Sequence, residues 1–207
     1  MPEMSDSARG FCTSRPYRII ARSVILPWAL QGARPSGEVL EIGAGSGAMA
    51  AGLLGRFPQS TIVATDYDPD MVAAARRALS RWSGRATAER ADPTSLPFED
   101  GRFGLVLSCA MLHHVIHWER ALSEVSRVLR PGGRLVGFDL MRVAGHRHGG
   151  GEGTPGRVPD HDHEPGGRRM VDPVAFEREL RDLPFSDVRV RPSTGRLAFR
   201  FAATRSA

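Results

Sequence analysis

The stretch VLEIGAGSGAMA, residues 39–50, joins an apolar run to a glycine-rich turn and a segment of small residues. The apolar run is typical of a buried strand, and the small residues after it are typical of a helix. Glycine allows a tight turn and lets a ligand approach the backbone without a Cβ in the way. The first N–H groups of such a helix are free to bind polar ligand groups. The stretch therefore predicts a nucleotide cradle in an α/β fold.

The rest of the chain from residue 37 onward alternates strand patterns with helix patterns. Strands are predicted at 38–42, 60–66, 85–92, 103–110, 133–140, 185–192 and 195–204. Helices are predicted at 48–57, 69–82, 118–130 and 172–183, and a further helical pattern covers 14–30. Strands that alternate with helices indicate a parallel sheet covered on both faces. We predict a Rossmann-like, doubly wound, mainly parallel sheet of seven strands, the last antiparallel, with an N-terminal helical extension.

With 207 residues the chain is long enough for one domain with a sizeable core. We divide this domain into a helical extension (1–36), a cofactor-binding core (37–140), a segment at 141–170, and a C-terminal helix and strand hairpin (171–207). The segment at 141–170 is rich in glycine, proline and histidine and has no periodicity. It is a functional lid or a disordered loop. It follows the fifth strand, so it is expected at the carboxyl edge of the sheet, where ligands bind.

The composition is that of an ordinary globular protein, with 41% hydrophobic and 25% charged residues. No apolar run reaches the roughly 18 residues of a membrane span, and the first ten residues lack the order of a signal peptide, so we expect a cytoplasmic protein. The net charge is +5, and all 28 basic residues are arginine, scattered among acids. This scatter argues against a nucleic-acid partner. The absence of lysine excludes Schiff-base chemistry.

An acidic residue that binds ribose hydroxyls is expected about twenty residues after the glycines, at the end of the second strand. Asp66 holds that position. Its carboxylate can accept from both hydroxyls of an unphosphorylated ribose. Gly43, Gly45 and Ala48 also satisfy the G-x-G-x-x-A fingerprint of nicotinamide enzymes. The turn by itself therefore leaves an NAD-dependent oxidoreductase open.

Five motifs follow one another in a characteristic order: VLEIGAGSG, TDYDPDMV, ADPTSLPFEDGRFGLVLS, MLHHV and RVLRPGGRLV. In this order they resemble the class I S-adenosylmethionine-dependent methyltransferases that act on small molecules, over about Val39 to Leu140. The resemblance implies S-adenosyl-L-methionine as cofactor and methyl transfer to a small-molecule acceptor. It leaves the oligomeric state unknown. The chain departs from the family at Gly104, where an aspartate is usual.

The resemblance also implies which residues hold the methionyl part of the cofactor. Gly43, Ala44, Gly45 and Gly47 would pass beneath it. Glu41 would orient this loop or reach the cofactor amino group through water. The alternative interpretation of Glu41 is a strand-end acid at the surface.

Further residues are implied for the nucleoside and the methyl group. Asp66 would bind the ribose hydroxyls, and Tyr67 would flank the adenine. Asp92 would accept from the adenine amino group with Pro93 nearby, and Ser108 would line the floor beside the methyl group. The alternatives are a packing ring for Tyr67 and a turn cap for Asp92.

A general base is needed only where the acceptor must lose a proton. His113, His114 and Asp139 lie near predicted strand ends at the catalytic edge, and histidine titrates near neutral pH. The alternative for the histidines is a pocket wall or a core position. His146, His148, His161 and His163 have ligand types that suit zinc or nickel. Their loop lacks preorganisation, so we predict a solvated polar lid and no metal site.

Two other functions remain open at this point. A non-catalytic protein could bind the same cofactor as a sensor or partner module. A nucleic-acid methylase is a third alternative, but the Asn/Asp-Pro-Pro-aromatic step of adenine methylases is missing after the fourth strand.

Overall fold

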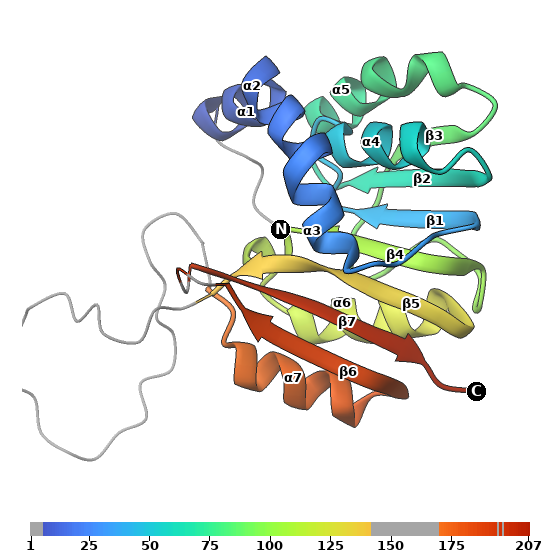
Figure 1. Cartoon of the computed structure of the whole chain (residues 1–207), viewed down its shortest axis with the longest axis vertical. Coiled ribbons are helices and arrows are strands. Elements are labelled where there is room, and N and C mark those ends of the chain that lie inside the picture. Colours follow the sequence, from blue (N-terminus) through green and yellow to red (C-terminus); the bar gives the residue numbers. More distant parts are fainter. Residues whose placement is uncertain (1–5, 142–169, 194, 196) are drawn as a thin grey trace, which may run out of the picture.

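The computed structural model describes residues 6–141, 170–193, 195 and 197–207. Within these residues a seven-stranded sheet has the order β3-β2-β1-β4-β5-β7-β6 (Figure 1). The strands are β1 (Gly37–Ile42), β2 (Ser60–Asp66), β3 (Ala86–Arg90), β4 (Phe103–Cys109), β5 (Leu129–Leu140), β6 (Phe185–Pro192) and β7 (Ala198–Arg205). Strand β7 pairs antiparallel with β5 and β6, and the other neighbours pair in parallel. The predicted fold class is confirmed.

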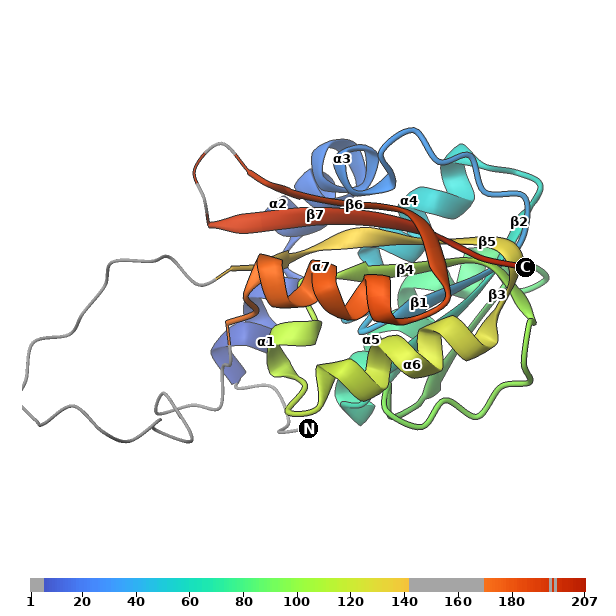
Figure 2. The ribbon, with the colours of Figure 1, turned by 90° about the horizontal axis from the view of Figure 1, so that it is seen from below.

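Helices cover both faces of the sheet (Figures 1 and 2). They are α1 (Asp6–Thr13), α2 (Arg15–Ile20), the π-helical η1 (Ala21–Ile25), α3 (Leu26–Leu30), α4 (Ala48–Arg56), α5 (Pro69–Leu79), the short η2 (Ser80–Trp82) and η3 (Leu112–His114), α6 (Trp118–Val128) and α7 (Pro173–Asp182). One hydrophobic cluster packs α3, α4 and α5 on the sheet, and another packs α6 and α7. The carboxyl ends of the parallel strands form the edge of the sheet at which ligands bind in open α/β folds.

Two helices begin with the same local device. The side chain of Asp68 accepts from the backbone N–H groups of Asp70 and Met71 at the start of α5, and proline follows it. Asp172 accepts in the same way from Val174 at the start of α7. An aspartate cap followed by proline satisfies a free N–H group and sets the first helical φ angle. Helix α5 therefore starts at the predicted residue, and α7 starts one residue after the predicted one.

The boundary between α6 and β5 differs from the prediction. The helix ends at Val128, and β5 begins at Leu129 in place of Gly133. Pro131 lacks an N–H group, and proline disfavours helical backbone in the residue before it. Leu129 is therefore already extended and pairs with Phe103, and the register shifts before Leu105. The predicted helix over 118–130 was too long for this reason.

Gly104, the departure from the family pattern, lies at the amino end of β4. A Cβ there would come 3.1 Å from Nη2 of Arg130, so the guanidinium of Arg130 covers this position. The glycine turn follows the carboxyl end of the neighbouring strand β1. Gly104 thus lies at the opposite edge of the sheet from the glycines of the turn.

Residues 142–169 lie outside the described residues, and so do the predicted lid and its four histidines, His146, His148, His161 and His163. On either side of them, Met141 and Val171 form a parallel bridge next to the end of β5. In the described part of the chain we find no helix with the length and apolarity to cross a membrane.

Candidate cofactor site at the carboxyl edge of the sheet

The glycine turn adopts left-handed backbone at three positions, with φ of 68° at Gly43, 52° at Gly45 and 72° at Gly47. A Cβ at Gly43 would collide with the side chain of Met111, and its distance from Met111 Cβ would be 2.6 Å. A Cβ at Gly47 would lie 3.1 Å from Cα of Ala75 in α5. A Cβ at Gly45 would meet nothing within 4 Å. Gly43 and Gly47 thus allow Met111 and Ala75 to pack against the turn, whereas Gly45 leaves its backbone open to a ligand.

Asp66 is 9% exposed at the end of β2, beside the turn. Its Oδ2 accepts from the N–H of Gly45 at 2.8 Å, and its Oδ1 accepts from the N–H of Asp68 at 2.9 Å. Burial raises the pKa of Asp66, although these backbone bonds favour its charged form. The carboxylate therefore holds the turn, a role separate from the ribose binding predicted for it. Sequence reasoning missed this first role.

Glu41 in β1 is 1% exposed, and its Oε2 has no hydrogen-bond partner among the described residues. Burial raises its pKa to about 8, and the charge of Asp66 adds to the shift. Oγ of Ser108 in the adjacent β4 is likewise buried and unpartnered within the described chain. The register of β1 and β4 pairs Ile42 with Ser108, so Glu41 and Ser108 lie on opposite faces of the sheet. Because native structures rarely leave buried polar atoms unpaired, each of these two atoms indicates a polar partner on its own face. The alternative of a surface acid at Glu41 is excluded by its burial.

The positions predicted for the adenine lie on the next two strand ends. The half-buried Tyr67 has the guanidinium carbon of Arg90 5.0 Å from its ring centre. Oδ1 of Asp92 accepts from both the N–H and the hydroxyl of Thr94, at 2.8 and 2.7 Å. Burial opposes the charge of Asp92, but these bonds outweigh it and lower its pKa. Asp92 is therefore a turn cap with Pro93 buried beside it, and its Oδ2 is not used by these bonds.

Asp139 and His113 are brought together at the end of β5. Oδ2 of Asp139 accepts from the N–H groups of Met111 and Leu112, at 3.1 and 2.7 Å. Its Oδ1 accepts from the N–H of Leu140 and lies 2.6 Å from Nδ1 of His113. A carboxylate only accepts, so we assign the Nδ1 proton to His113 as the donor, which leaves Nε2 as its free nitrogen. The ring of His114 lies 4.0 Å from that of His113.

The N-terminal helices contact the same edge. Oγ of Ser46 in the glycine turn donates to the carbonyl of Cys12 at 2.7 Å. Arg9 pairs with Asp68 at 2.9 Å and with Asp70 at 3.2 Å, directly after β2. No local sequence signal predicts these contacts, since they join residues 34 or more positions apart.

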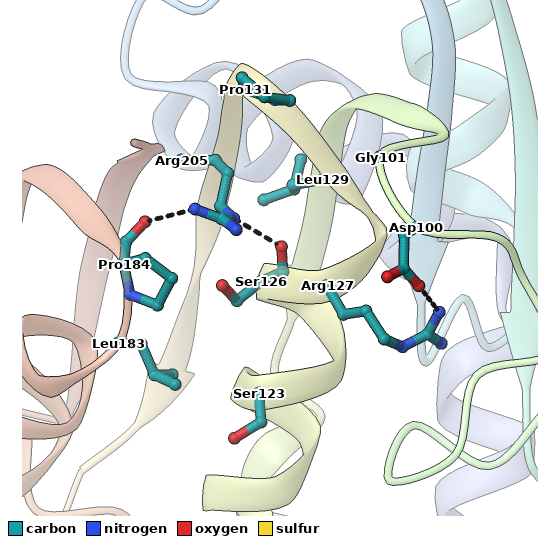
Figure 3. Close-up of a pocket in the computed structure, with 10 residues that line it drawn as sticks. All are labelled: Asp100, Gly101, Ser123, Ser126, Arg127, Leu129, Pro131, Leu183, Pro184 and Arg205. Atoms are coloured by element: carbon teal, nitrogen blue, oxygen red, sulfur yellow. Dashed lines mark hydrogen bonds and ion pairs between the residues drawn. The ribbon is translucent and has the colours of Figure 1, made fainter. Parts of the chain in front are cut away.

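A cavity of about 490 Å³ lies away from the glycine turn, at the amino edge of the sheet (Figure 3). Its two arginines are already bonded. Arg127 pairs with Asp100 at 2.7 Å, and Arg205 donates to the carbonyls of Ser126 and Pro184. These bonds hold the ends of the surrounding elements together. The candidate site is therefore the glycine turn and not this cavity.

Among the described residues, no group of three or more histidine, cysteine or acidic side chains could hold a metal ion. The features above define a nucleotide-cofactor site on a Rossmann-like sheet. Residues 40–137 match a family described as "Methyltransferase domain".

The relatives and solved structures carry the comparison further. A demethylmenaquinone methyltransferase of Thermus thermophilus is 38% identical over 99 residues, which cover 48% of this chain and 45% of the relative. A malonyl-[acyl-carrier protein] O-methyltransferase of Geobacter sulfurreducens is 36% identical over 60% of this chain and 45% of the relative. A structure titled as a SAM-dependent methyltransferase from Aquifex aeolicus shares the fold, with a TM-score of 0.71, 16% identity, and coverage of 98% of this chain and 100% of that one.

The match over residues 40–137 and the relatives named above confirm the predicted resemblance to the class I S-adenosylmethionine-dependent methyltransferases and the predicted cofactor. The matched stretch covers a little under half of the curated relatives above.

Proposed function

We propose that the protein transfers a methyl group from S-adenosylmethionine to a small-molecule acceptor. The observation that carries the proposal is the open backbone of Gly45 held against the carboxylate of Asp66 at the carboxyl edge of the sheet. When bound, the cofactor supplies a methyl group on a positively charged sulfur, activated for in-line displacement. The chain must bind and orient the two reactants and exclude water.

The residues present fit this cofactor. A positively charged ligand suits the buried Oε2 of Glu41, which lacks a partner within the described residues, because an opposite charge restores its ionised form. Oγ of Ser108 offers a second polar contact at the end of β4, on the opposite face of the sheet from Glu41. Asp66 would bind the ribose hydroxyls, and the uncommitted Oδ2 of Asp92 would accept from the adenine amino group. The roles of the glycines, Ala44, Tyr67 and Pro93 likewise remain proposals.

For an acceptor that loses a proton, His113 is the proposed base. Methylation at carbon or at a hydroxyl releases a proton, and several relatives are named C- or O-methyltransferases. The bond to Asp139 orients the ring of His113 and leaves Nε2 to take that proton. Asp139 is then a positioning residue that also holds the loop after β4. The ring of His114 lies 4.0 Å from that of His113 and is tilted by 41°, so substitution of His114 is the control for substitution of His113.

The cofactor site is tested by calorimetric titration with S-adenosylmethionine, S-adenosylhomocysteine and NAD. We expect the first two to bind and Asp66→Ala to weaken them about 100-fold, because hydrogen bonds to a charged group contribute roughly 1.5–3 kcal/mol each. Asp182→Ala, at the exposed end of α7, is the matched control and should bind normally. Binding of NAD alone, or unchanged affinity in Asp66→Ala, would overturn the assignment.

The base is tested with acceptors of the kinds named for the relatives, a demethylmenaquinone analogue first. We expect His113→Gln to lower kcat by about 10²-fold or more and to remove the acidic limb of the pH–rate profile. Asp139→Asn should lower kcat and also destabilise the fold by about 2 kcal/mol, since it leaves buried N–H groups poorly paired. His114→Gln should keep the limb. A limb that survives in His113→Gln would contradict the role.

A further inference from the structure

The N-terminal helices turn an apolar face outward. Of the eight large hydrophobic side chains exposed among the described residues, four lie between residues 11 and 24. Their exposed fractions are 63% for Phe11, 62% for Ile19, 50% for Ile20 and 62% for Val24. Contiguous exposed apolar side chains usually mark an interaction site.

This outward face is not required by the core. Helices α2, η1 and α3 form one continuous helical run from Arg15 to Leu30. Its inner face buries Ala21 and Leu26 against the cluster that also contains α4. Ile20 and Val24 are four positions apart, so they lie on the same side of the helix. The inner face therefore supplies the buried contacts of this run, and the outer face is left to solvent.

The same segment is exclusively basic. Between residues 7 and 37 the sequence contains five arginines and no acidic residue. Arg18 lines a hollow toward α5, and Arg22 packs its side chain against Gly52 of α4 with its Nε buried. The neighbouring charges that act on Arg22 are those of Arg18 and of Arg81 in η2. Within the described part of the chain, Arg22 and Arg81 have no acidic partner. The segment thus combines exposed apolar side chains with uncompensated positive charge.

A small hollow adds a place for a negative group. It has a volume of about 220 Å³ and lies where α1 and α2 face α5. Arg18 and Arg77 approach it from the two sides, and Thr13 and Ser46 add hydroxyl groups. None of the described residues that line it is acidic. Its chemistry suits a phosphate, because guanidinium groups bind phosphate oxygens through charge-assisted hydrogen bonds.

We propose that this N-terminal surface, defined by Phe11, Ile19, Ile20 and Val24 with Arg18, Arg77 and Arg81, docks the protein on an anionic phospholipid bilayer. The apolar side chains would enter the interface, and the arginines would bind the phosphates of the headgroups. Exposed apolar side chains near several arginines match a layer of anionic headgroups over acyl chains. The proposal goes beyond the methyl-transfer function and does not depend on it.

Docking would act close to the cofactor site. The carbonyl of Cys12 in α1 accepts from Ser46 of the glycine turn, and Arg9 in the same helix pairs with Asp68. A bilayer that holds α1 and α2 in place would therefore also hold α1 against the glycine turn.

The test is co-sedimentation of the protein with vesicles of phosphatidylcholine, with and without phosphatidylglycerol. We expect binding only where phosphatidylglycerol is present, and weaker binding at high salt. The triple variant Ile19→Ser, Ile20→Ser, Val24→Ser and the double variant Arg18→Gln, Arg81→Gln should each lower the affinity about tenfold or more. Val174→Ser with Arg178→Gln, on exposed positions of α7, is the matched control.

Thermal unfolding and S-adenosylmethionine affinity are measured on the same samples, so loss of folding or of cofactor binding is distinguished from loss of docking. Equal binding to both vesicle types, or no binding to either, would overturn the proposal. A dimer that is lost in the triple variant while vesicles are not bound would also overturn it, and would assign the apolar face to a second copy of the chain.

Discussion

Gly43→Ala is expected to lower the free energy of unfolding by roughly 2–4 kcal/mol, as the sum of left-handed strain and overpacking. The added Cβ would lie 2.6 Å from Cβ of Met111, in backbone with φ of 68°. Movement of Met111 would itself reduce stability, because its N–H donates to Asp139 and its side chain is buried. Chemical denaturation of the protein without cofactor measures the change.

Gly45→Ala is the matched comparison, since it has the same turn and the same sign of φ but no neighbour within 4 Å. We expect it to lose only about 1 kcal/mol of stability, from backbone strain. Its affinity for S-adenosylmethionine should nevertheless fall about tenfold or more, because the Cβ would stand where the cofactor approaches the backbone. Equal destabilisation by the two substitutions would contradict the packing assigned to Met111, and normal affinity in Gly45→Ala would contradict the cofactor position.

Glu41→Gln is expected to change how stability depends on pH. The folded protein holds the Glu41 proton up to a pKa of about 8, whereas its ordinary value is 4.5. Between these values the unfolded chain has lost the proton and the folded chain has kept it. The free energy of unfolding therefore falls with rising pH by up to about 1.4 kcal/mol per unit. The stability that the protonated Glu41 contributes is fully present below pH 4.5 and is lost as pH rises through about 8. A glutamine side chain does not titrate, so the variant should show a flatter profile.

Urea unfolding at about pH 5, 6.5 and 8, which span the range between the two pKa values, measures how the free energy of unfolding depends on pH. The exposed Glu99→Gln is the control and should leave the slope unchanged. At pH 8 Glu41→Gln should be the more stable protein and yet bind S-adenosylmethionine more weakly, because it lacks the charge that suits a cationic ligand. A variant that loses stability in parallel with the wild type would show that Glu41 does not titrate in this window.

The sequence by itself determined the class of fold and the edge of the sheet at which the candidate site lies. Strand and helix periods alternate along the chain, and their hydrophobic patterns are local, so β1, β2 and α4 begin within a residue of the prediction. The carboxyl ends of parallel strands must meet at one edge. This placed Asp66 beside Gly45 although they are 21 positions apart. The aspartate and proline caps of α5 and α7 were predictable for the same local reason.

Only the tertiary structure decided what each side chain is bonded to. Asp139 holds the backbone of Met111 and Leu112 across 27 or more positions, and no sequence period records such a contact. The sequence left open whether Glu41 is a cofactor residue or a surface acid, whereas the structure buries it, leaves its Oε2 unpaired among the described residues and raises its pKa. Leu129 pairs with Phe103 of β4, so β5 begins at Leu129 and not at the predicted Gly133. Local patterns specify which segments form strands and helices, whereas burial, charge and hydrogen-bond partners depend on how distant segments pack.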